Sequence, residues 1–436
     1  MTTQLKSALL NNASVSADEP TVEQWLTLFR DSVPRELFSG WERHRPIWEA
    51  HRRMAREHLK SIPAYPERYH GRGIVICAGG AAYFVSAYVA AKMLRHVGCA
   101  LPIQFWHLTD EIDDHMRSLV APLGVSCIDA GEIDRRRDRP CRILNGWELK
   151  CFAILFCPYQ HVLLLDADNV PVIDPSDLLD SPEFDQYGAI FWPDYGRIRG
   201  ESPIWEICEV PFRDEPEFES GQIAVDKRRC WNALNLAQHY NDHSDFYYRH
   251  VYGDKETFHL AFLRTDTPFA MPTAPIHTLR STMCQHDFAG RRLFQHRVGD
   301  KWRLDGANRR VDDFWFEDLC RYFIEELVAS WSGQPFWSRP CREHQALVVG
   351  DSDQQDYWYE RVGYDRRILE LRRDGTIGEG AAAYERLWSM NTVHGQSVLT
   401  ILGDGSTTCH LRRENGLWSG RWRKHEQMAV RLMRVS

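Results

Sequence analysis

Paired cysteines are missing from this sequence of 436 residues, although it contains 12 cysteines. Each cysteine stands alone in apolar surroundings, as Cys77 and Cys151 do, and no Cys-x-x-Cys pair occurs. Zinc sites and disulfide frameworks need closely spaced cysteines, whereas isolated ones behave as small buried hydrophobic side chains. The sequence therefore predicts reduced, buried thiols rather than disulfides or a zinc site.

Long apolar runs and an excess of positive charge are missing as well. No apolar run approaches the roughly 20 residues that a membrane-spanning helix needs. Residues 1–20 contain no charged leader followed by a sustained apolar core, so we expect no signal peptide, no membrane anchor and a cytoplasmic location. The formal net charge of −8 argues against a nucleic-acid partner held by bulk electrostatics.

Short apolar runs alternate with amphipathic helical segments through the middle of the chain. The predicted strands cover residues 73–77, 101–106, 125–130, 162–165 and 188–191, and the predicted helices cover residues 82–96, 110–123 and 147–158. This alternation predicts βα units with a mostly parallel sheet, so the expected fold class is α/β with a Rossmann-like domain at residues 66–332. Residues 1–65 are predicted to be helical, at 21–33 and 34–62, and to pack on that domain.

The end of the chain has a different pattern. After a predicted helix at residues 313–331, Pro335 and Pro340 mark a boundary, and short alternating runs follow with turns such as Asp374-Gly375. Residues 335–436 are therefore predicted to form a small antiparallel β domain. Four tryptophans of this segment either form a sugar-stacking platform or belong to its core, namely Trp358, Trp388, Trp418 and Trp422.

The most informative chemical signal is an apolar run that ends in two carboxylates. Val162 to Leu165 has the length and composition of a buried strand, and the chain must turn at Asp166, Asp168 and Pro171. This carboxyl edge is where open α/β sheets bind their ligands. Two oxygen donors separated by one residue suit Mg²⁺ or Mn²⁺ bridged to a diphosphate, with a solvated turn as the structural alternative.

A strand that runs into glycines indicates a contact with a nucleotide. Residues 73–77 lead into Gly79 and Gly80, and a predicted helix follows. A tight turn before a helix N-terminus lets the backbone approach a nucleotide closely. The segment is neither the G-x-G-x-x-G fingerprint of dinucleotide binding nor a P-loop, so only a general nucleotide contact is predicted here.

Six short segments, found in this order, carry a resemblance to a known family. They are residues 71–80, 101–106, 149–150, 163–170, 189–194 and 219–222. Together they resemble the fungal α-mannosyltransferases of the Mnn1/Mnn2 type. The resemblance covers about residues 70 to 305 and implies a GT-A glycosyltransferase fold, a nucleoside-diphosphate sugar donor, a divalent metal and retention of anomeric configuration. GDP-mannose is the favoured donor and a UDP-sugar the alternative, while the acceptor is a glycan, a protein or a small molecule.

Two histidines compete to be the third protein ligand of the metal. His296 opens a segment that resembles the His-x-x-Gly-x-x-Lys pattern of other GT-A enzymes, although Lys301 comes one residue early. Asp168 is predicted to bind the metal directly, and Asp166 to contact the metal or the ribose. By this resemblance His296 completes the metal site and Lys301 meets a phosphate, with an ordinary solvated lysine as the alternative. His286 is the rival ligand, and each histidine is otherwise a packing or surface residue.

Further polar residues are expected around the donor sugar. Glu219 and Gln222 are predicted to lie in a loop that enters a strand, where they hold donor hydroxyls or shield the reactive carbon, with a structural turn as the alternative. Asp254 opens a helix and resembles the start of the Asp-Lys-Asp segment of related transferases, with helix capping as the structural alternative. Asp194 and Lys150 are expected to reach the donor, although a salt bridge would equally explain Lys150.

These predictions describe a metal-dependent retaining glycosyltransferase that moves a hexose, with mannose favoured, from a nucleoside-diphosphate sugar to an acceptor. The alternative enzyme is a sugar-phosphate nucleotidyltransferase, which ordinarily has a basic Gly-rich loop after its first strand, whereas residues 78–82 contain no Lys or Arg. A non-catalytic sugar-nucleotide or glycan-binding protein is the alternative from another class, and the presence of both Asp166 and Asp168 argues against it.

Overall fold

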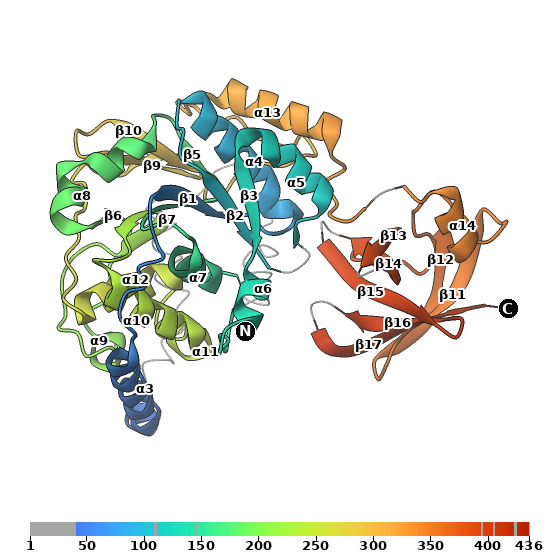
Figure 1. The fold of residues 1–436 in the computed structure, drawn as a ribbon, viewed down its shortest axis with the longest axis horizontal. Coiled ribbons are helices and arrows are strands. Elements are labelled where there is room, and N and C mark those ends of the chain that lie inside the picture. The colour runs from blue at the N-terminus through green and yellow to red at the C-terminus, as the bar shows by residue number, and fades with distance from the viewer. Residues whose placement is uncertain are drawn as a thin grey trace, which may run out of the picture.

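The computed structural model describes residues 41–108, 111–144, 146–337, 339–393, 396–403, 406–422 and 425–435 (Figure 1). The helix predicted at residues 21–33 and the beginning of the one predicted at 34–62 lie outside the described residues. The rest of the second helix is confirmed as α3 (Trp41–Ser61). Among the described residues, no helix is long and apolar enough to cross a membrane.

A six-stranded sheet forms the centre of the larger part of the molecule, with the strand order β3-β2-β1-β4-β7-β6. Its strands are β1 (Arg72–Cys77), β2 (Ile103–His107), β3 (Val125–Asp129), β4 (His161–Asp166), β6 (Ala189–Pro193) and β7 (Phe218–Asp226). The first four in spatial order are parallel, whereas β7 runs antiparallel to both β4 and β6. The predicted parallel sheet is confirmed as far as β4 and becomes mixed beyond it.

Helices cover both faces of this sheet, so successive side chains of the central strands enter two different cores (Figure 1). Ile74 and Ile76 of β1 pack in one core, and Val75 packs in the other. Burial on both faces explains why β1 and β4 are continuous apolar runs in the sequence. The first core includes residues of α4 (Gly80–His96), α5 (Asp114–Val120) and α13 (Glu317–Ser330), and the second includes residues of α7 (Glu148–Phe156), α10 (Trp231–Asp242) and α12 (Asp254–Arg264).

Shorter elements complete the α/β part of the molecule. They are α6 (Ala130–Arg135), α8 (Pro182–Tyr187), α9 (Ile204–Ile207), α11 (Ser244–Tyr247) and the 3₁₀ turns η3 (Ala121–Leu123) and η4 (Pro175–Asp180). The predicted helix at 313–331 is confirmed only from Glu317. Its start is displaced because Phe316 has a φ of 62° and because the Glu317 carboxylate accepts a hydrogen bond from the Val311 amide at 3.2 Å.

A second, smaller sheet crosses the carboxyl edge of the first. It has the order β5-β10-β9-β8 and consists of β5 (Asn169–Pro171), β10 (Arg292–His296), β9 (Thr282–His286) and β8 (His277–Leu279). β5 follows β4 directly after the turn at Asp168, and β10 pairs with it antiparallel, His296 opposite Asn169. The chain more than a hundred residues downstream therefore returns to the Asp-x-Asp turn.

Helix α3 packs against α10 and α11 through a group of aromatic rings. His51 stacks on Phe246 with ring centroids 3.6 Å apart, and His58 stacks on His239 at 4.7 Å. Burial, aided by neighbouring histidines that include His243, lowers the pKa of His239 to about 2 and that of His51 to about 4. These two rings are neutral at pH 7, which allows them to pack as apolar groups between the helices.

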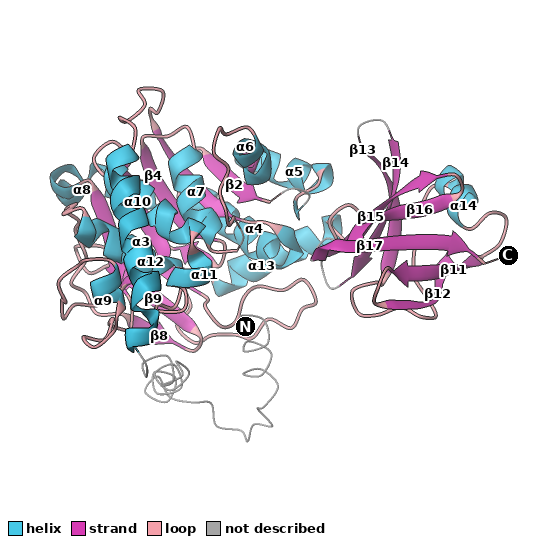
Figure 2. Cartoon of the chain, turned by 90° about the horizontal axis from the view of Figure 1, so that it is seen from below, coloured by secondary structure: helices cyan, strands magenta, loops and turns pink. Residues whose placement is uncertain are grey.

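The end of the chain forms a separate antiparallel sheet beyond α5 and α13, at one end of the molecule (Figure 2). Its order is β12-β11-β17-β16-β15-β14-β13, with the short helix α14 (Arg342–Val348) before it. The strands are β11 (Gln354–Arg361), β12 (Asp365–Arg372), β13 (Leu387–Val393), β14 (Gln396–Gly403), β15 (Ser406–Glu414), β16 (Leu417–Trp422) and β17 (His425–Arg434). The expected small antiparallel β domain is confirmed, and so is the expected α/β fold before it.

The tryptophans of this sheet do not form a common sugar-stacking platform. Trp388, Trp418 and Trp422 are buried in its hydrophobic core. Trp358 is more exposed, and the guanidinium of Arg366 lies 4.4 Å from its ring centroid. The platform interpretation is therefore wrong for three of the four, because a small sheet needs its large apolar side chains to build a core at all.

Candidate active site

Asp166 and Asp168 lie at the carboxyl edge of the central sheet, where β4 ends and the chain turns into β5. The Nε2 atom of His296 lies 3.3 Å from Asp168 Oδ1 and 3.7 Å from Asp166 Oδ2. One ligand atom from each of these three residues lies within 4.8 Å of the others. The structure thus brings together the three residues that the sequence predicted as metal ligands, and we call them the metal group.

The pairing of β10 with β5 explains why His296 reaches this position. The Arg297 amide donates a hydrogen bond to the Asp168 carbonyl at 3.0 Å, which fixes the end of β10 beside the turn. The rival, His286, lies at the end of β9 opposite Arg292, four residues before His296 on β10. Among the described residues, His286 belongs to no group of three possible metal ligands.

Glu219 lies on the other side of the His296 ring. Its Oε1 is 3.2 Å from His296 Nδ1 and also accepts a hydrogen bond from the Gly221 amide at 2.7 Å. The predicted loop at Glu219 is wrong, since Glu219 to Gln222 are buried residues of β7. A Cβ at Gly221 would lie 2.5 Å from His296 Nδ1, so the close approach that this glycine permits is that of the imidazole.

Neighbouring charges shift the pKa values of both His296 and Asp168. Burial disfavours the imidazolium of His296, yet Asp168 and Glu219 outweigh it and raise its pKa to about 10. Burial also opposes ionisation of Asp168, but His296 and Lys301 hold the pKa of Asp168 below its ordinary value. Lys301, which was expected at a phosphate, forms an ion pair with Asp168.

Lys150 is buried in the first turn of α7, and its ammonium contacts two acids of the site. Its Nζ lies 2.8 Å from Asp166 Oδ1 and 3.5 Å from Asp254 Oδ2, and it donates a hydrogen bond to Ser220 Oγ at 3.1 Å. Burial disfavours the ammonium, but the carboxylates of Asp166 and Asp254 outweigh it and raise the pKa of Lys150. The salt-bridge interpretation of Lys150 therefore describes its contacts, and Asp254 joins the site through it.

Several buried polar atoms beside the metal group have no hydrogen-bond partner. Asn169 Nδ2 donates to Gln222 Oε1 at 2.6 Å, which leaves Gln222 Nε2 and Asn169 Oδ1 unsatisfied. Asp254 Oδ2 has no hydrogen-bond partner either. Unsatisfied buried polar atoms are rare because each costs desolvation free energy, so a cluster of them marks a place where polar ligand atoms fit.

Asp194 and the Gly79–Gly80 turn, which were also expected near the donor, contact other residues of the protein. Asp194 forms an ion pair with Lys255, which also pairs with Glu217. Gly80 has a φ of 77°, as its turn requires, and a Cβ at Gly79 would lie 1.9 Å from Glu111 Oε2. Sequence reasoning missed Glu111 and Glu217, because each is one of several acids in its segment and no local pattern distinguishes it. It also missed Asn169 and Lys255, although both are adjacent to predicted site residues.

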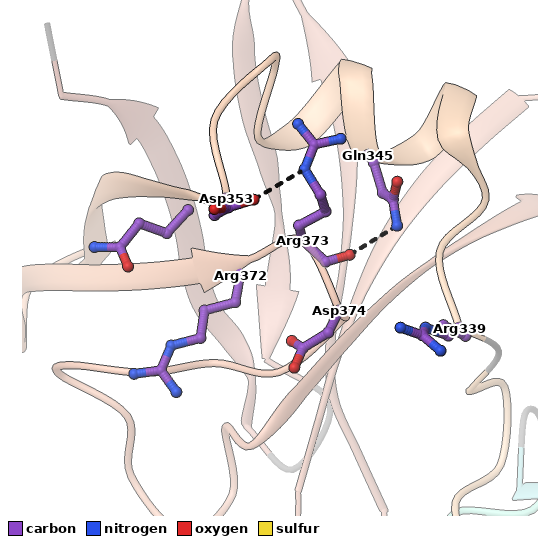
Figure 3. Close-up of a pocket in the computed structure, with 7 residues that line it drawn as sticks. Arg339, Gln345, Asp353, Arg372, Arg373 and Asp374 are labelled. Carbon is purple, nitrogen blue, oxygen red and sulfur yellow. Dashed lines mark hydrogen bonds and ion pairs between the residues drawn. The ribbon is translucent and has the colours of Figure 1, made fainter.

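The pocket drawn in Figure 3 lies elsewhere, in the C-terminal sheet, and contains none of the predicted site residues. Its charged side chains contact groups inside and outside the pocket: Arg372 pairs with Glu370, and Asp374 accepts a hydrogen bond from the Thr376 amide. Arg373 Nε lies 3.8 Å from Asp353 Oδ1, and Gln345 Nε2 donates to the Arg373 carbonyl at 3.0 Å.

The residues of the metal group fit a divalent cation. Two carboxylates and an imidazole form a donor set that Mn²⁺ accepts and that Mg²⁺ accepts through its oxygens. Three positive groups surround the two carboxylates, namely Lys150, Lys301 and the protonated His296, and a divalent cation would supply two positive charges at the same place. Because a ligating imidazole must be neutral, a cation at His296 Nε2 must displace a proton.

Comparisons with known proteins point to one family. The model of the family Mannosyl_trans3, described as "Mannosyltransferase putative", matches residues 71–210 and 211–296. Relatives include alpha-1,2-mannosyltransferase MNN21 of Candida albicans, which is 27% identical over 300 residues that cover 56% of this chain and 44% of the relative. Alpha-1,2-mannosyltransferase MNN5 of Saccharomyces cerevisiae is 25% identical over 295 residues, which cover 54% of this chain and 50% of the relative. This chain therefore spans about half the length of the curated relatives that it matches.

Similarity to solved structures is remote. The galactosyltransferase LgtC in complex with donor and acceptor sugar analogues has a TM-score of 0.34 and 15% identity, over 46% of this chain and 73% of that chain. Mouse xyloside xylosyltransferase 1 has a TM-score of 0.33 and 14% identity, over 47% of this chain and 85% of that chain. The family model, by contrast, matches more than half of the sequence and includes every member of the metal group, and the chain accordingly belongs to the Mannosyl_trans3 family of mannosyltransferases.

Proposed function

We propose that this chain is a metal-dependent retaining glycosyltransferase that moves mannose from a nucleoside-diphosphate mannose, with GDP-mannose favoured, to a hydroxyl of an acceptor. The observation that carries the proposal is the metal group of Asp166, Asp168 and His296 at the carboxyl edge of β4. Family membership supports the sugar, since the relatives named above are alpha-1,2-mannosyltransferases.

Asp166, Asp168 and His296 would hold Mn²⁺ or Mg²⁺, which supplies positive charge to the diphosphate as the glycosidic bond breaks. Lys150 fixes Asp166, and Glu219 orients the His296 ring through Nδ1, so the acids do not reorganise during the reaction. Lys301 is 42% exposed at its side chain, so it can turn from Asp168 towards a phosphate.

Polar groups beside the metal group suit the sugar itself. Gln222 Nε2 and Asn169 Oδ1 lack hydrogen-bond partners, and so does Asp254 Oδ2. A donor hydroxyl can accept from the amide of Gln222 and donate to Asn169, which would hold the sugar ring while positive charge develops at its anomeric carbon. In the turn after the neighbouring strand β1, the Glu111 carboxylate lies against Gly79, whereas a Cβ at Gly80 would meet nothing within 4 Å, so the backbone at Gly80 is open to the nucleotide.

Metal-dependent donor hydrolysis tests this function without knowledge of the acceptor. Purified protein with Mn²⁺ is incubated with GDP-mannose, UDP-glucose, UDP-galactose and UDP-N-acetylglucosamine, and release of the nucleoside diphosphate is measured. We expect release from GDP-mannose, and its loss in Asp168→Asn, because the amide keeps the volume but removes the charge that holds the cation.

Asp351→Asn is the matched control, since Asp351 is exposed in the C-terminal part of the chain. It should behave like the parent protein. Equal metal-stimulated hydrolysis by Asp168→Asn and the parent would contradict the assignment of the metal group. Pyrophosphate release from a nucleoside triphosphate and a sugar phosphate would instead support a nucleotidyltransferase.

A further inference from the structure

Two stacked aromatic side chains, Trp147 and Tyr252, lie beside Asp254. Their ring centroids are 5.6 Å apart with an interplanar angle of 29°. Tyr252 is 56% exposed, which is unusual for a large ring that is already stacked on another. Exposed aromatic surface next to buried polar atoms is a common feature of ligand sites. Neither residue belongs to the metal group or to the Gly79–Gly80 turn.

Both rings stand at the same edge of the sheet as the metal group. Trp147 immediately precedes α7, and Lys150 in the first turn of that helix binds Asp166. Tyr252 comes two residues before Asp254, the first residue of α12, and Asp254 lies 3.5 Å from the same Lys150 ammonium. Lys150 therefore joins Asp166 to the two segments that carry these rings.

Gly253 fixes the position of the indole. A Cβ at this residue would lie 2.8 Å from Trp147 Cε3, so the Trp147 ring rests directly on the backbone between Tyr252 and Asp254. Trp147, from the start of α7, thus packs on the start of α12. A ligand that lies on Tyr252 would be held at a defined distance from Asp254.

The charges around the pair do not favour a charged ligand. Lys255 lies 5.7 Å from the Tyr252 ring centroid and is paired with three acids, Asp194, Glu217 and Glu256. Because these acids already share a cation, they offer little attraction to a second one. Asp254 Oδ2, in a residue that is only 5% exposed, remains as an acceptor without a hydrogen-bond partner. This oxygen faces the Lys150 ammonium at 3.5 Å, which leaves it able to accept a hydrogen bond. An apolar face with such an acceptor nearby matches a pyranose, which has an apolar C–H face and a rim of hydroxyl groups.

Tyr252 lies on a different side of the metal group from the nucleotide turn. Gly79 and Gly80 follow β1, whereas α12 packs on β7, and β4 with the Asp-x-Asp turn lies between those two strands. Helix α7, which follows Trp147, packs on β1 itself, so Trp147 reaches Tyr252 from the β1 side. A nucleotide at the glycines leaves the Tyr252 ring to another part of the reaction.

We propose that Trp147 and Tyr252 form a stacking platform for a pyranose ring of the acceptor, and that Asp254 accepts a hydrogen bond from one of its hydroxyls. This inference rests on the proposed function and names its acceptor as a sugar. It adds Trp147, before α7, and Tyr252, before α12, as residues that bind the acceptor.

Steady-state transfer from GDP-mannose to methyl α-D-mannopyranoside tests the platform. Tyr252→Ala and Trp147→Ala should each raise the KM for the acceptor sugar by about tenfold, the scale of one aromatic contact, without a matching rise in the KM for GDP-mannose. Tyr252→Phe keeps the ring and should stay within about twofold of the parent. Tyr322→Ala removes a comparably exposed ring, 55% exposed on α13, and is the matched control.

Saturation-transfer NMR with methyl α-D-mannopyranoside separates this proposal from the proposed function, because it requires no turnover. Binding by the parent protein that is lost in Tyr252→Ala and kept in Tyr252→Phe supports the platform, even if no donor is hydrolysed. No binding by the parent, or parent-like binding by Tyr252→Ala, overturns it. An equal loss of GDP affinity in the alanine variants would also overturn it, since the rings would then contact the donor nucleotide.

Discussion

Replacement of Lys150 by methionine tests whether one buried ammonium holds the two acids of the site together. Lys150 is 7% exposed, with Nζ 2.8 Å from Asp166 Oδ1 and 3.5 Å from Asp254 Oδ2. Methionine keeps an unbranched side chain of similar length but removes the charge. The variant therefore buries Asp166 and Asp254 near each other without a cation between them.

The size of the effect follows from burial. Removal of one partner of a buried ion pair destabilises a protein by about 3–5 kcal/mol. The lower end applies here, because the Asp166 side chain is 19% exposed and regains some hydration. Asp254 can also escape by protonation, since burial already raises its pKa and the loss of Lys150 raises it further. We expect a loss of about 3 kcal/mol at pH 8.

The same protonation gives the effect a pH dependence with a defined sign. A carboxyl whose folded pKa exceeds its unfolded pKa favours folding while it is protonated, and this contribution disappears as the pH rises through the folded pKa. The destabilisation of Lys150→Met should therefore be largest at pH 8 and smaller at pH 5.5.

Urea unfolding followed by tryptophan fluorescence measures these differences for Lys150→Met, Asp254→Asn and the double variant. The double variant should lose less free energy of unfolding than the sum of the single variants, because Asp254→Asn removes one of the stranded charges. Lys92→Met is the matched control, since Lys92 forms a partly exposed ion pair with Glu326 at 2.8 Å that is worth at most about 1 kcal/mol. A parent-like midpoint for Lys150→Met, or strict additivity with Asp254→Asn, would refute the reasoning.

Three further predictions concern other parts of the chain. Burial keeps His239 neutral in the folded protein, so its contribution to stability is present above the unfolded pKa of about 6.5 and is lost as the pH falls below it. The free energy of unfolding, measured in urea, should therefore fall between pH 7.5 and pH 5.5 by about 1.4 kcal/mol less in His239→Gln than in the parent. His70→Gln, at an exposed histidine, is the control and should not reduce this fall. Glu219→Gln should weaken Mn²⁺ binding by about 10- to 100-fold in calorimetry, because the carboxylate orients His296, and an unchanged affinity would contradict that role. A chain that ends at Ser332 should keep metal-dependent donor hydrolysis, because the metal group and the other proposed donor residues all precede it; a folded truncation without hydrolysis would mean that the C-terminal sheet completes the site.

The sequence was most informative where one segment carries the whole signal. β4 is buried on both faces, so it appears as an uninterrupted apolar run, and its end is marked by Asp166 and Asp168. His296 was predicted as the third member of the metal group because its segment resembles the His-x-x-Gly-x-x-Lys pattern of other GT-A enzymes. These features depend on neighbours in the chain, which a single sequence displays directly.

The remaining contacts depend on segments that meet only in the folded protein. Glu219 to Gln222 are polar and were expected in a loop, but they occupy β7, which lies between β4 and β6. Their polar side chains are buried because their partners, Asn169 and His296, arrive from β5 and β10. The sequence around Glu219 to Gln222 does not indicate partners that come from distant strands. Asp194 and Lys301 illustrate the same limit, since each pairs with a residue from another element.

The return of β10 to the Asp-x-Asp turn has a consequence for the order in which the protein assembles. Lys301 and Asp168 are 133 residues apart in the chain, and β10 can pair with β5 only after that long loop has closed. Closure over such a distance costs entropy before the new contacts repay it, so this pairing is expected late in folding. A cation that needs both the turn and His296 then has nothing to bind in a partly folded chain. Mn²⁺ should accordingly slow unfolding while leaving the refolding rate almost unchanged.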